Sequence, residues 1–319
     1  MKPLRLLAAA LATTLLCAAE EPAPGFIRVD EDDNAARLQT AVTRYEKDGV
    51  TVDLIGAVHI ADKKYYETLS KRFEGYESLL YEMIGGEKFN AAREAAAAPN
   101  LPAEKPAEPE APAEPEAPAA DDAPAEKEEK KDMSGLHQIY GMVARFLALT
   151  GQTDHIDYTK KNFVHADLTH DEFEAMQKER GESLLGFAMK NAKQQQQAGA
   201  KQPDMAKLMT AMLAGNSNLV KLQLIHTLGQ GDDQIGAFAG ESVIITDRNI
   251  RAIEVTDREI AAGKKKLAIF YGAAHFPDME KRLLEKGFKR TTHEWITAWD
   301  IPKPQPKPQP APAPEKEAA

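Results

Sequence analysis

Short apolar runs and helical patterns alternate at both ends of the chain, which is typical of an α/β fold. Residues 52–55 and 267–271 are β-prone runs that fit buried strands. After each run, apolar residues recur at helical spacing, first at Tyr65, Tyr66, Leu69 and Phe73, and later at Met279, Leu283 and Leu284. A second apolar run follows each helix. The pattern therefore predicts parallel strands joined by helical crossovers.

The middle of the chain is helical in pattern, and two other tracts lack the composition of a folded core. Apolar residues recur at helical spacing in 136–147 and 205–213. The tracts 90–132 and 302–319 are rich in Ala, Pro and charged or amide residues, so we expect them to be extended and solvated. We predict an α/β fold whose mixed central sheet is formed by the N- and C-terminal parts of one split domain, with a helical middle cap. The parts are residues 20–89 and 133–301, the second of which includes the cap.

The first nineteen residues have the pattern of a signal peptide. A basic start is followed by an apolar stretch, 6–16, and small residues lead up to Ala19. We therefore expect an exported protein, periplasmic or extracellular, with no transmembrane helix in the mature chain. The single cysteine, Cys17, follows Leu16 rather than a small residue, so a lipid anchor is less favoured. Cleavage after Ala19 leaves no thiol, which excludes disulfides and a cysteine nucleophile.

The negative charge of the chain is concentrated in one tract. The formal net charge is −10, and residues 101–132 contain eleven acidic residues against four lysines. The acidity therefore describes a linker rather than a functional surface. Because no basic stripe with interleaved aromatic residues is present, nucleic acid is not expected as a partner.

One motif, Gly-Ala-x-His-x-x-Asp, occurs twice, at 56–62 and at 272–278, each time directly after a predicted strand. The carboxyl ends of parallel strands meet at one edge of the sheet, where open α/β folds bind ligands. We therefore expect His59 and His275 to share one site, with Glu82 at the end of the next apolar run. A lone histidine at a strand end is usually structural, but two copies in the same context favour a common site.

The other motif residues have local explanations. Gly56 and Gly272 lack Cβ, so each glycine allows a close backbone approach or a positive φ where its strand turns. Asp62 and Asp278 are each expected to be the N-cap of the following helix.

A second polar cluster lies at His165, Asp167 and His170. These side chains suit a cation, but they border Thr169 to Glu172, which has the spacing of a helix capping box. Helix initiation is the favoured interpretation. The signatures of the common zinc proteases, α/β-hydrolases and nucleotide-binding proteins are absent from the sequence.

Together, the paired Gly-x-x-His motifs, the glutamate that ends the run 79–83, and the Arg248-Asn249 pair resemble the TraB/TIKI/GumN superfamily. The resemblance covers the split domain and implies an extracellular or periplasmic hydrolase, since some members are metal-dependent peptidases. The active-site residues that it implies are His59, His275, Glu82 and Arg248. Members commonly have Glu before the Arg-Asn pair, and here Asp247 stands in that place. Related folds include esterase-like and haem-binding proteins.

The chemistry of these residues suits a divalent metal ion of zinc, manganese or cobalt type. Two imidazoles and the Glu82 carboxylate offer three ligands and leave positions open for water and a peptide or small-molecule substrate. Glu82 is then a ligand or a general base, and Arg248 stabilises an oxyanion or neutralises Glu82. Three alternatives remain. Glu82 and Arg248 form only a structural ion pair, the protein binds a ligand without catalysis, or it is a metal-independent His/Glu esterase. The oligomeric state does not follow from the sequence.

Overall fold

The computed structural model describes residues 25–87, 141–183, 203–229 and 242–304, together with 186, 187, 189, 190 and 193. The predicted signal peptide, the whole 90–132 insertion and most of the C-terminal tail lie outside the described residues. The strands are β1 (Ile27–Glu31), β2 (Ala35–Lys47), β3 (Val50–Ala57), β4 (Ile60–Ala61), β5 (Ser78–Tyr81), β6 (Thr150–Gly151), β7 (Phe163–His165), β8 (Lys266–Gly272) and β9 (Lys289–Pro302). The α-helices are α1 (Lys63–Phe73), α4 (His170–Arg180), α6 (Met205–Leu213), α7 (Ser217–Leu228), α9 (Arg248–Ala261) and α10 (Phe276–Glu285). Three short turns are also helical: η1 (Gln152–Asp154), the π-helical η3 (Val243–Asp247) and η4 (Ala273–His275).

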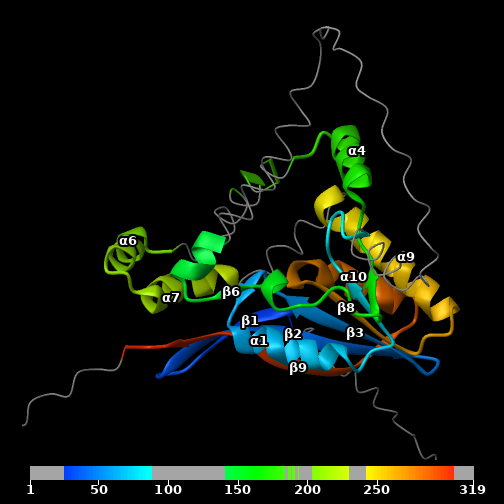
Figure 1. Ribbon diagram of the computed structural model, residues 1–319, viewed down its shortest axis with the longest axis horizontal. Helices are drawn as coiled ribbons and strands as arrows, with labels where there is room; N and C mark the ends of the chain where they lie inside the picture. Colours follow the sequence, from blue (N-terminus) through cyan, green and yellow to red (C-terminus); the bar gives the residue numbers. More distant parts are fainter. Residues whose placement is uncertain are drawn as a thin grey trace, which may run out of the picture.

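A seven-stranded mixed sheet forms the centre of the molecule (Figure 1). Strands β3, β8, β5 and β7 are parallel neighbours in that order. Strand β2 is antiparallel to its three partners: β1 and β3 share one of its edges, and β9 covers the other. Strands from both ends of the sequence thus alternate in one sheet. The predicted α/β fold with a mixed sheet built from a split domain is confirmed.

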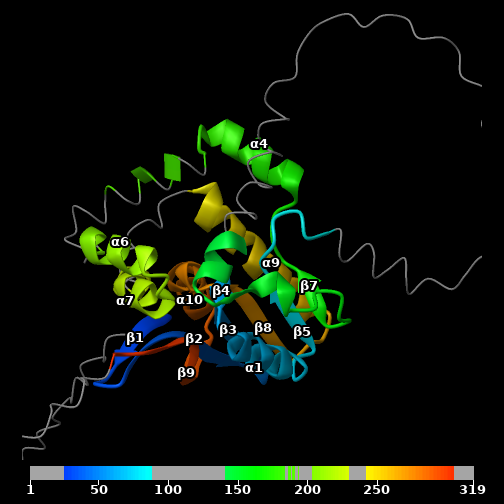
Figure 2. The same cartoon turned by 60° about the vertical axis from the view of Figure 1, so that its left-hand side comes forward.

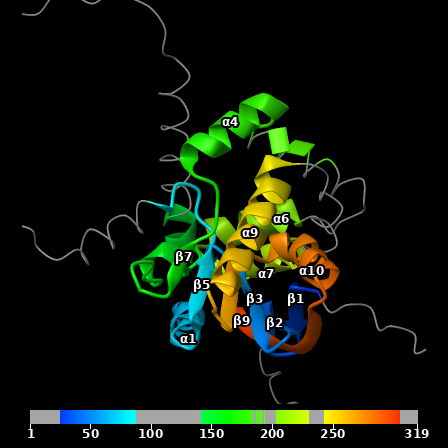
Figure 3. The same ribbon diagram turned by 90° about the vertical axis from the view of Figure 1, so that its right-hand side faces the viewer.

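Both faces of the sheet are buried, as the continuous apolar runs predicted. Along β8, Leu267 and Ile269 pack on the side of α9 and α10, whereas Ala268 and Phe270 pack on the side of α1. This alternation follows from the two-residue period of a strand. Figure 3 shows α1 on one side of the sheet and α9 and α10 on the other. Full burial of a side chain such as Phe270 contributes about 1.5–3 kcal/mol, so the central strands supply much of the folding energy.

The helices that follow the two Gly-x-x-His motifs begin at different points. Asp62 takes the N-cap position of α1, but its side chain makes no capping bond and instead accepts the backbone N–H of Asp300 at 2.8 Å. Helix α10 begins at Phe276, so Asp278 lies inside its first turn rather than at the N-cap. The N-cap prediction is therefore confirmed in position for Asp62, although its side chain does not cap the helix, and it is wrong for Asp278. The second helix begins early because Pro277, with its fixed φ, suits the first turn of a helix.

The middle of the chain contributes α4 and α6, as predicted, and also α7. Residues 141–146 are helical as well, in agreement with the helix predicted at 136–147, the first part of which lies outside the described residues. Ala211, Val220 and Ile225 of α6 and α7 join the core on the α1 side of the sheet. Helix α4 extends away from the sheet beyond the start of α9 (Figure 2), and the predicted capping box of Thr169 and Glu172 forms at its N-terminus. Among the helices in the described ranges, none has the length and apolar character needed to cross a membrane.

Candidate functional site

The two Gly-x-x-His motifs leave adjacent parallel strands. Strands β3 and β8 pair directly, with Gly56 opposite Tyr271 and Ala57 opposite Gly272, so the second motif begins one residue later along the sheet. The chain leaves β3 through α1 on one face and leaves β8 through α10 on the other. Two neighbouring strands whose crossovers depart on opposite faces define a topological switch point, where open α/β sheets bind ligands. The motifs therefore lie where the topology places a site.

Neither motif glycine has a positive φ, and only Gly56 is needed for close packing. A Cβ on Gly56 would lie 3.0 Å from the Cβ of Thr40 and 3.3 Å from the carbonyl oxygen of Ala41. Gly272 has a φ of −50°, and its N–H donates to Glu82 Oε2 at 2.6 Å. The close-approach interpretation therefore holds for Gly56. Gly272 contributes a backbone donor that any residue other than proline also has.

Glu82 follows β5 directly, one residue after the buried Tyr81, so alternation directs it to the α9 side of the sheet. Its side chain is 13% exposed. Oε2 accepts the N–H of Gly272, and Oε1 accepts Arg248 Nη2 at 2.8 Å. The same Oε1 lies 3.5 Å from Nε2 of His275. The structure thus brings together Glu82, His275 and Arg248, as the sequence predicted.

Arg248 begins α9, immediately after the π-helical turn η3, and is buried. Its guanidinium donates to both oxygens of Asp167, from Nε at 2.9 Å and from Nη2 at 2.6 Å. Nη1 donates to the carbonyl oxygen of Ile244 at 3.3 Å. Arg248 therefore bridges two buried carboxylates, those of Asp167 and Glu82.

Asp167 is a site residue that the sequence interpretation missed. Helix initiation was the favoured explanation for its cluster, yet its side chain is fully buried against Arg248, and only its Oδ1 also accepts the N–H of Leu168. The missed signal was β7, a strand of three residues that runs parallel to β5. Because β7 ends beside β5, the residue that follows it reaches the same edge of the sheet as Glu82.

Asn249 also belongs to the site, although only its neighbour Arg248 was predicted there. Its side chain is fully buried, and its Oδ1 lies 2.6 Å from Nδ1 of His275. Its Nδ2 donates to the carbonyl oxygen of His275 at 3.2 Å and to Asp278 Oδ2 at 2.9 Å. Asp278, expected as an N-cap, thus contacts Asn249, and it also accepts Arg282 Nε at 2.7 Å.

His59 lies on the exposed turn after β3. Its carbonyl oxygen accepts the backbone N–H of Gln152 at 2.9 Å, which connects this turn to η1. Burial by itself raises the pKa of Glu82, but the charge of Arg248 and the nearby rings of His275 and His59 outweigh it. The pKa of Glu82 is therefore held well below its usual range, and the carboxylate is ionised at neutral pH. His59 is near enough to act on Glu82 electrostatically.

The donor atoms of this site match a divalent metal ion in type but do not form a complete set of ligands. Nε2 of His275 and Oε1 of Glu82 face each other across 3.5 Å, and a third donor is expected from His59. In the described ranges, no three or more His, Cys, Asp or Glu side chains are grouped so that they could hold a metal ion. Two of the three predicted ligands are therefore paired, and His59 does not complete the group.

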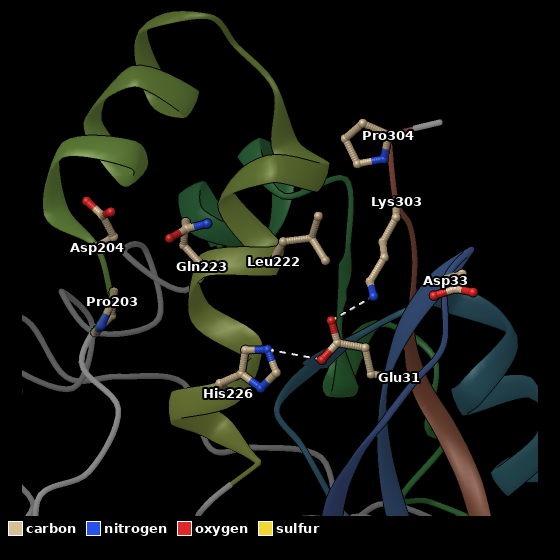
Figure 4. Close-up of a pocket in the computed structure, with 9 residues that line it drawn as sticks. All are labelled: Glu31, Asp33, Pro203, Asp204, Leu222, Gln223, His226, Lys303 and Pro304. Atoms are coloured by element: carbon tan, nitrogen blue, oxygen red, sulfur yellow. Dashed lines mark ion pairs between the residues drawn. The ribbon is translucent and has the colours of Figure 1, made fainter. Parts of the chain in front are cut away.

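A hollow elsewhere on the molecule contains none of the predicted site residues. It has a volume of about 500 Å³ and lies between α6, α7, β1 and the end of β9 (Figure 4). His226 and Lys303 both pair with Glu31 across it, at 3.3 Å and 2.8 Å. Since Lys303 neutralises Glu31, the hollow offers no arrangement comparable with the buried cluster at Glu82.

Comparisons of the chain with protein-family models, with curated proteins and with solved structures find no match. The likeness to the TraB/TIKI/GumN superfamily therefore rests on the two motifs, the strand glutamate and the Arg-Asn pair.

Proposed function

We propose that this protein is an extracytoplasmic hydrolase of the TraB/TIKI/GumN type that cleaves a peptide or amide bond beside Glu82 and His275. The observation that carries the proposal is the buried pair of Nε2 and Oε1, 3.5 Å apart, at the switch point of the sheet. A carboxylate and an imidazole in this position are suited to accept and return a proton during hydrolysis. Export is inferred from residues 1–19 alone.

The charge balance of the site supports a role for a cation. Glu82 and Asp167 contribute two negative charges, and Arg248, whose pKa is raised by those carboxylates despite its burial, contributes one positive charge. One negative charge remains, and an uncompensated charge is costly in a buried site. A proton on His275 or a metal ion beside it balances the cluster.

A divalent ion of zinc, manganese or cobalt type would need His59 to join His275 and Glu82, which are already paired. Such an ion would supply an activated water and would polarise the scissile carbonyl group. The residues of the chain prepare the site independently of it. Arg248 holds Glu82 in place and keeps it ionised, while the N–H of Gly272 orients the second carboxylate oxygen. Among the described residues, the Arg248 guanidinium donates hydrogen bonds to Asp167, Glu82 and Ile244, which supports neutralisation of Glu82 over stabilisation of an oxyanion.

A second candidate function is non-catalytic binding of a peptide, haem or another ligand in the envelope. It is favoured by one observation: both oxygens of Glu82 already have partners within the protein. On this alternative, the cluster stabilises the sheet edge, and the ligand contacts the surrounding loops.

The test begins with mature protein purified without a metal-affinity tag. Metal content is measured by elemental analysis for the wild type, for a His59→Ala/His275→Ala double variant and for His226→Ala, which alters a histidine outside the site. We expect a near-stoichiometric ion in the wild type and in His226→Ala, and none in the double variant. Failure of all three proteins to take up zinc, manganese or cobalt contradicts the metal-dependent mechanism.

Hydrolysis is then measured on a peptide library by mass spectrometry, with circular dichroism to confirm folding. We expect His275→Ala and Glu82→Gln to abolish cleavage while His226→Ala retains it. Cleavage that requires His275 but resists chelators identifies the metal-independent esterase-like mechanism. Absence of cleavage by a folded wild type that still binds peptide or haem supports the binding protein.

A further inference from the structure

The two faces of the Asn249 amide have different neighbours, and these neighbours fix its orientation. Nδ2 lies within hydrogen-bond distance of the carbonyl oxygen of His275 and of Oδ2 of Asp278. A backbone carbonyl only accepts hydrogen bonds, so the group that faces it must be the NH₂. The reversed amide would place an oxygen against two oxygens in a fully buried position. The amide oxygen of Asn249 must therefore face the ring of His275.

The orientation of Asn249 decides where His275 carries its proton. The amide oxygen lies 2.6 Å from Nδ1, and an amide oxygen cannot donate, so Nδ1 carries the hydrogen. A neutral imidazole has only one N–H, which leaves a lone pair on Nε2. That lone pair faces Oε1 of Glu82. The hydrogen bond at Nδ1, on the side of the ring away from the site, thus determines that Nε2, which faces the site, carries no hydrogen.

The other tautomer would close the site. With the hydrogen on Nε2, His275 would donate a hydrogen bond to Glu82. The ring and the carboxylate would then bind each other rather than a substrate or ion. The hydrogen bond from Nδ1–H to Asn249 stabilises the Nδ1–H tautomer relative to the Nε2–H tautomer. Oriented second partners of this kind fix the tautomer of functional histidines in general.

The chain of contacts continues outward from Asn249 to the surface. Asp278 lies in the first turn of α10, three residues after its N-cap His275, and receives the Asn249 NH₂. Arg282, one turn further along, holds the Asp278 carboxylate at 2.7 Å. Asp278, the aspartate of the second motif, therefore binds Asn249 and Arg282 rather than capping the helix.

We propose that Asp278 and Asn249 are positioning residues that fix His275 as the Nδ1–H tautomer and keep its Nε2 available to the site. The importance of this tautomer for catalysis rests on the proposed function, whereas the tautomer itself does not. Arg248 and Asn249 are consecutive at the start of α9. One helix end therefore orients both members of the Glu82–His275 pair.

The tautomer is measured by long-range ¹H–¹⁵N correlation NMR on histidine-labelled full-length protein, as purified and after chelation. Spectra are recorded at a pH where the ring has lost its charge, and the His275 signals are assigned by their loss in His275→Gln. In the wild type we expect the Nδ1–H form in at least about tenfold excess, equivalent to about 1.4 kcal/mol. In Asn249→Leu, which has similar size and no acceptor, the Nε2–H form should predominate.

Two further variants keep the test decisive. Asp278→Asn, a milder change, should let the Asn249 amide reverse and reduce the Nδ1–H excess several-fold even if Asn249→Leu fails to fold. Asp257→Asn, which alters an exposed carboxylate paired with Lys286, should leave the spectrum unchanged. An Nε2–H form in the wild type overturns the proposal, as does an unchanged tautomer in both Asn249→Leu and Asp278→Asn. Because NMR needs neither substrate nor metal, failure of the hydrolase proposal is recognised separately by the cleavage assay.

Discussion

Replacement of Arg248 by glutamine should strongly destabilise the protein. The Arg248 guanidinium forms ion pairs with two buried carboxylates, those of Asp167 and Glu82. Asp167 has a fully buried side chain, and that of Glu82 is 13% exposed. Glutamine keeps a polar side chain but removes the charge and the bidentate ion pair with Asp167. Removal of one partner from a buried ion pair costs about 3–5 kcal/mol, which is a large part of the stability of a typical domain.

The effect should depend on pH in a defined direction. In the wild type the pKa of Glu82 is lowered, so its stabilising contribution is complete above its unfolded pKa of about 4.3 and is lost as the pH falls through the folded pKa. Without Arg248, burial dominates and raises the pKa of Glu82, which favours the protonated form. The stability difference between wild type and variant should therefore be largest near neutral pH and should narrow on acidification below about pH 5.

The assay is urea unfolding followed by tryptophan fluorescence, since Trp299 is buried in the core. Arg251→Gln is the matched control, because Arg251 lies on the same helix and makes a two-pronged contact with Glu172 at the surface. That exposed pair should contribute only about 0.2–1 kcal/mol. A loss in Arg248→Gln no larger than in Arg251→Gln, or a loss that does not change with pH, would refute the reasoning.

Three further outcomes are expected. Gly56→Ala should lower the free energy of unfolding by about 1–3 kcal/mol, because the added methyl group crowds β2. Gly141→Ala, which places its methyl group in open space, should not lower it, and urea unfolding of the two variants tests the difference. His59→Ala, at an exposed turn, should change stability by no more than about 0.5 kcal/mol yet abolish peptide cleavage, and a variant that unfolds or stays active contradicts this. Intact-mass analysis of exported protein should show a chain that begins after Ala19, and an uncleaved or lipid-modified N-terminus would contradict the signal-peptide prediction.

The elements that the sequence predicted well are those determined by local pattern. The runs at β3 and β8 are β-prone and apolar, and their burial on both faces agrees with parallel neighbours. Since the carboxyl ends of such strands meet, His275 and Glu82 were expected to be close, and they are. Arg248 was placed at the site by the family resemblance rather than by the pattern.

The residues that the sequence interpretation missed depend on long-range pairing. Asp167 reaches the site through β7, a three-residue strand too short to show a period. Asn249 becomes part of the site only because α9 packs where β8 ends. The different roles of Asp62 and Asp278 have a similar origin: the chain after His59 pairs β4 with β6, whereas the chain after His275 turns at once into a helix. Identical motifs thus adopt different structures because their surroundings differ.

The start of α9 supports the proposed reaction at this edge of the sheet over a purely structural role. A lone structural ion pair between Glu82 and Arg248 would stabilise the sheet without any need to orient a histidine. Here the next residue, Asn249, holds His275 through its ring and its backbone, and in the proposed Nδ1–H tautomer a lone pair on Nε2 faces Oε1 of Glu82. Facing lone pairs repel each other unless a cation lies between them, and burial increases that cost. This arrangement suits a site that binds a proton or metal ion reversibly, as the proposed function requires.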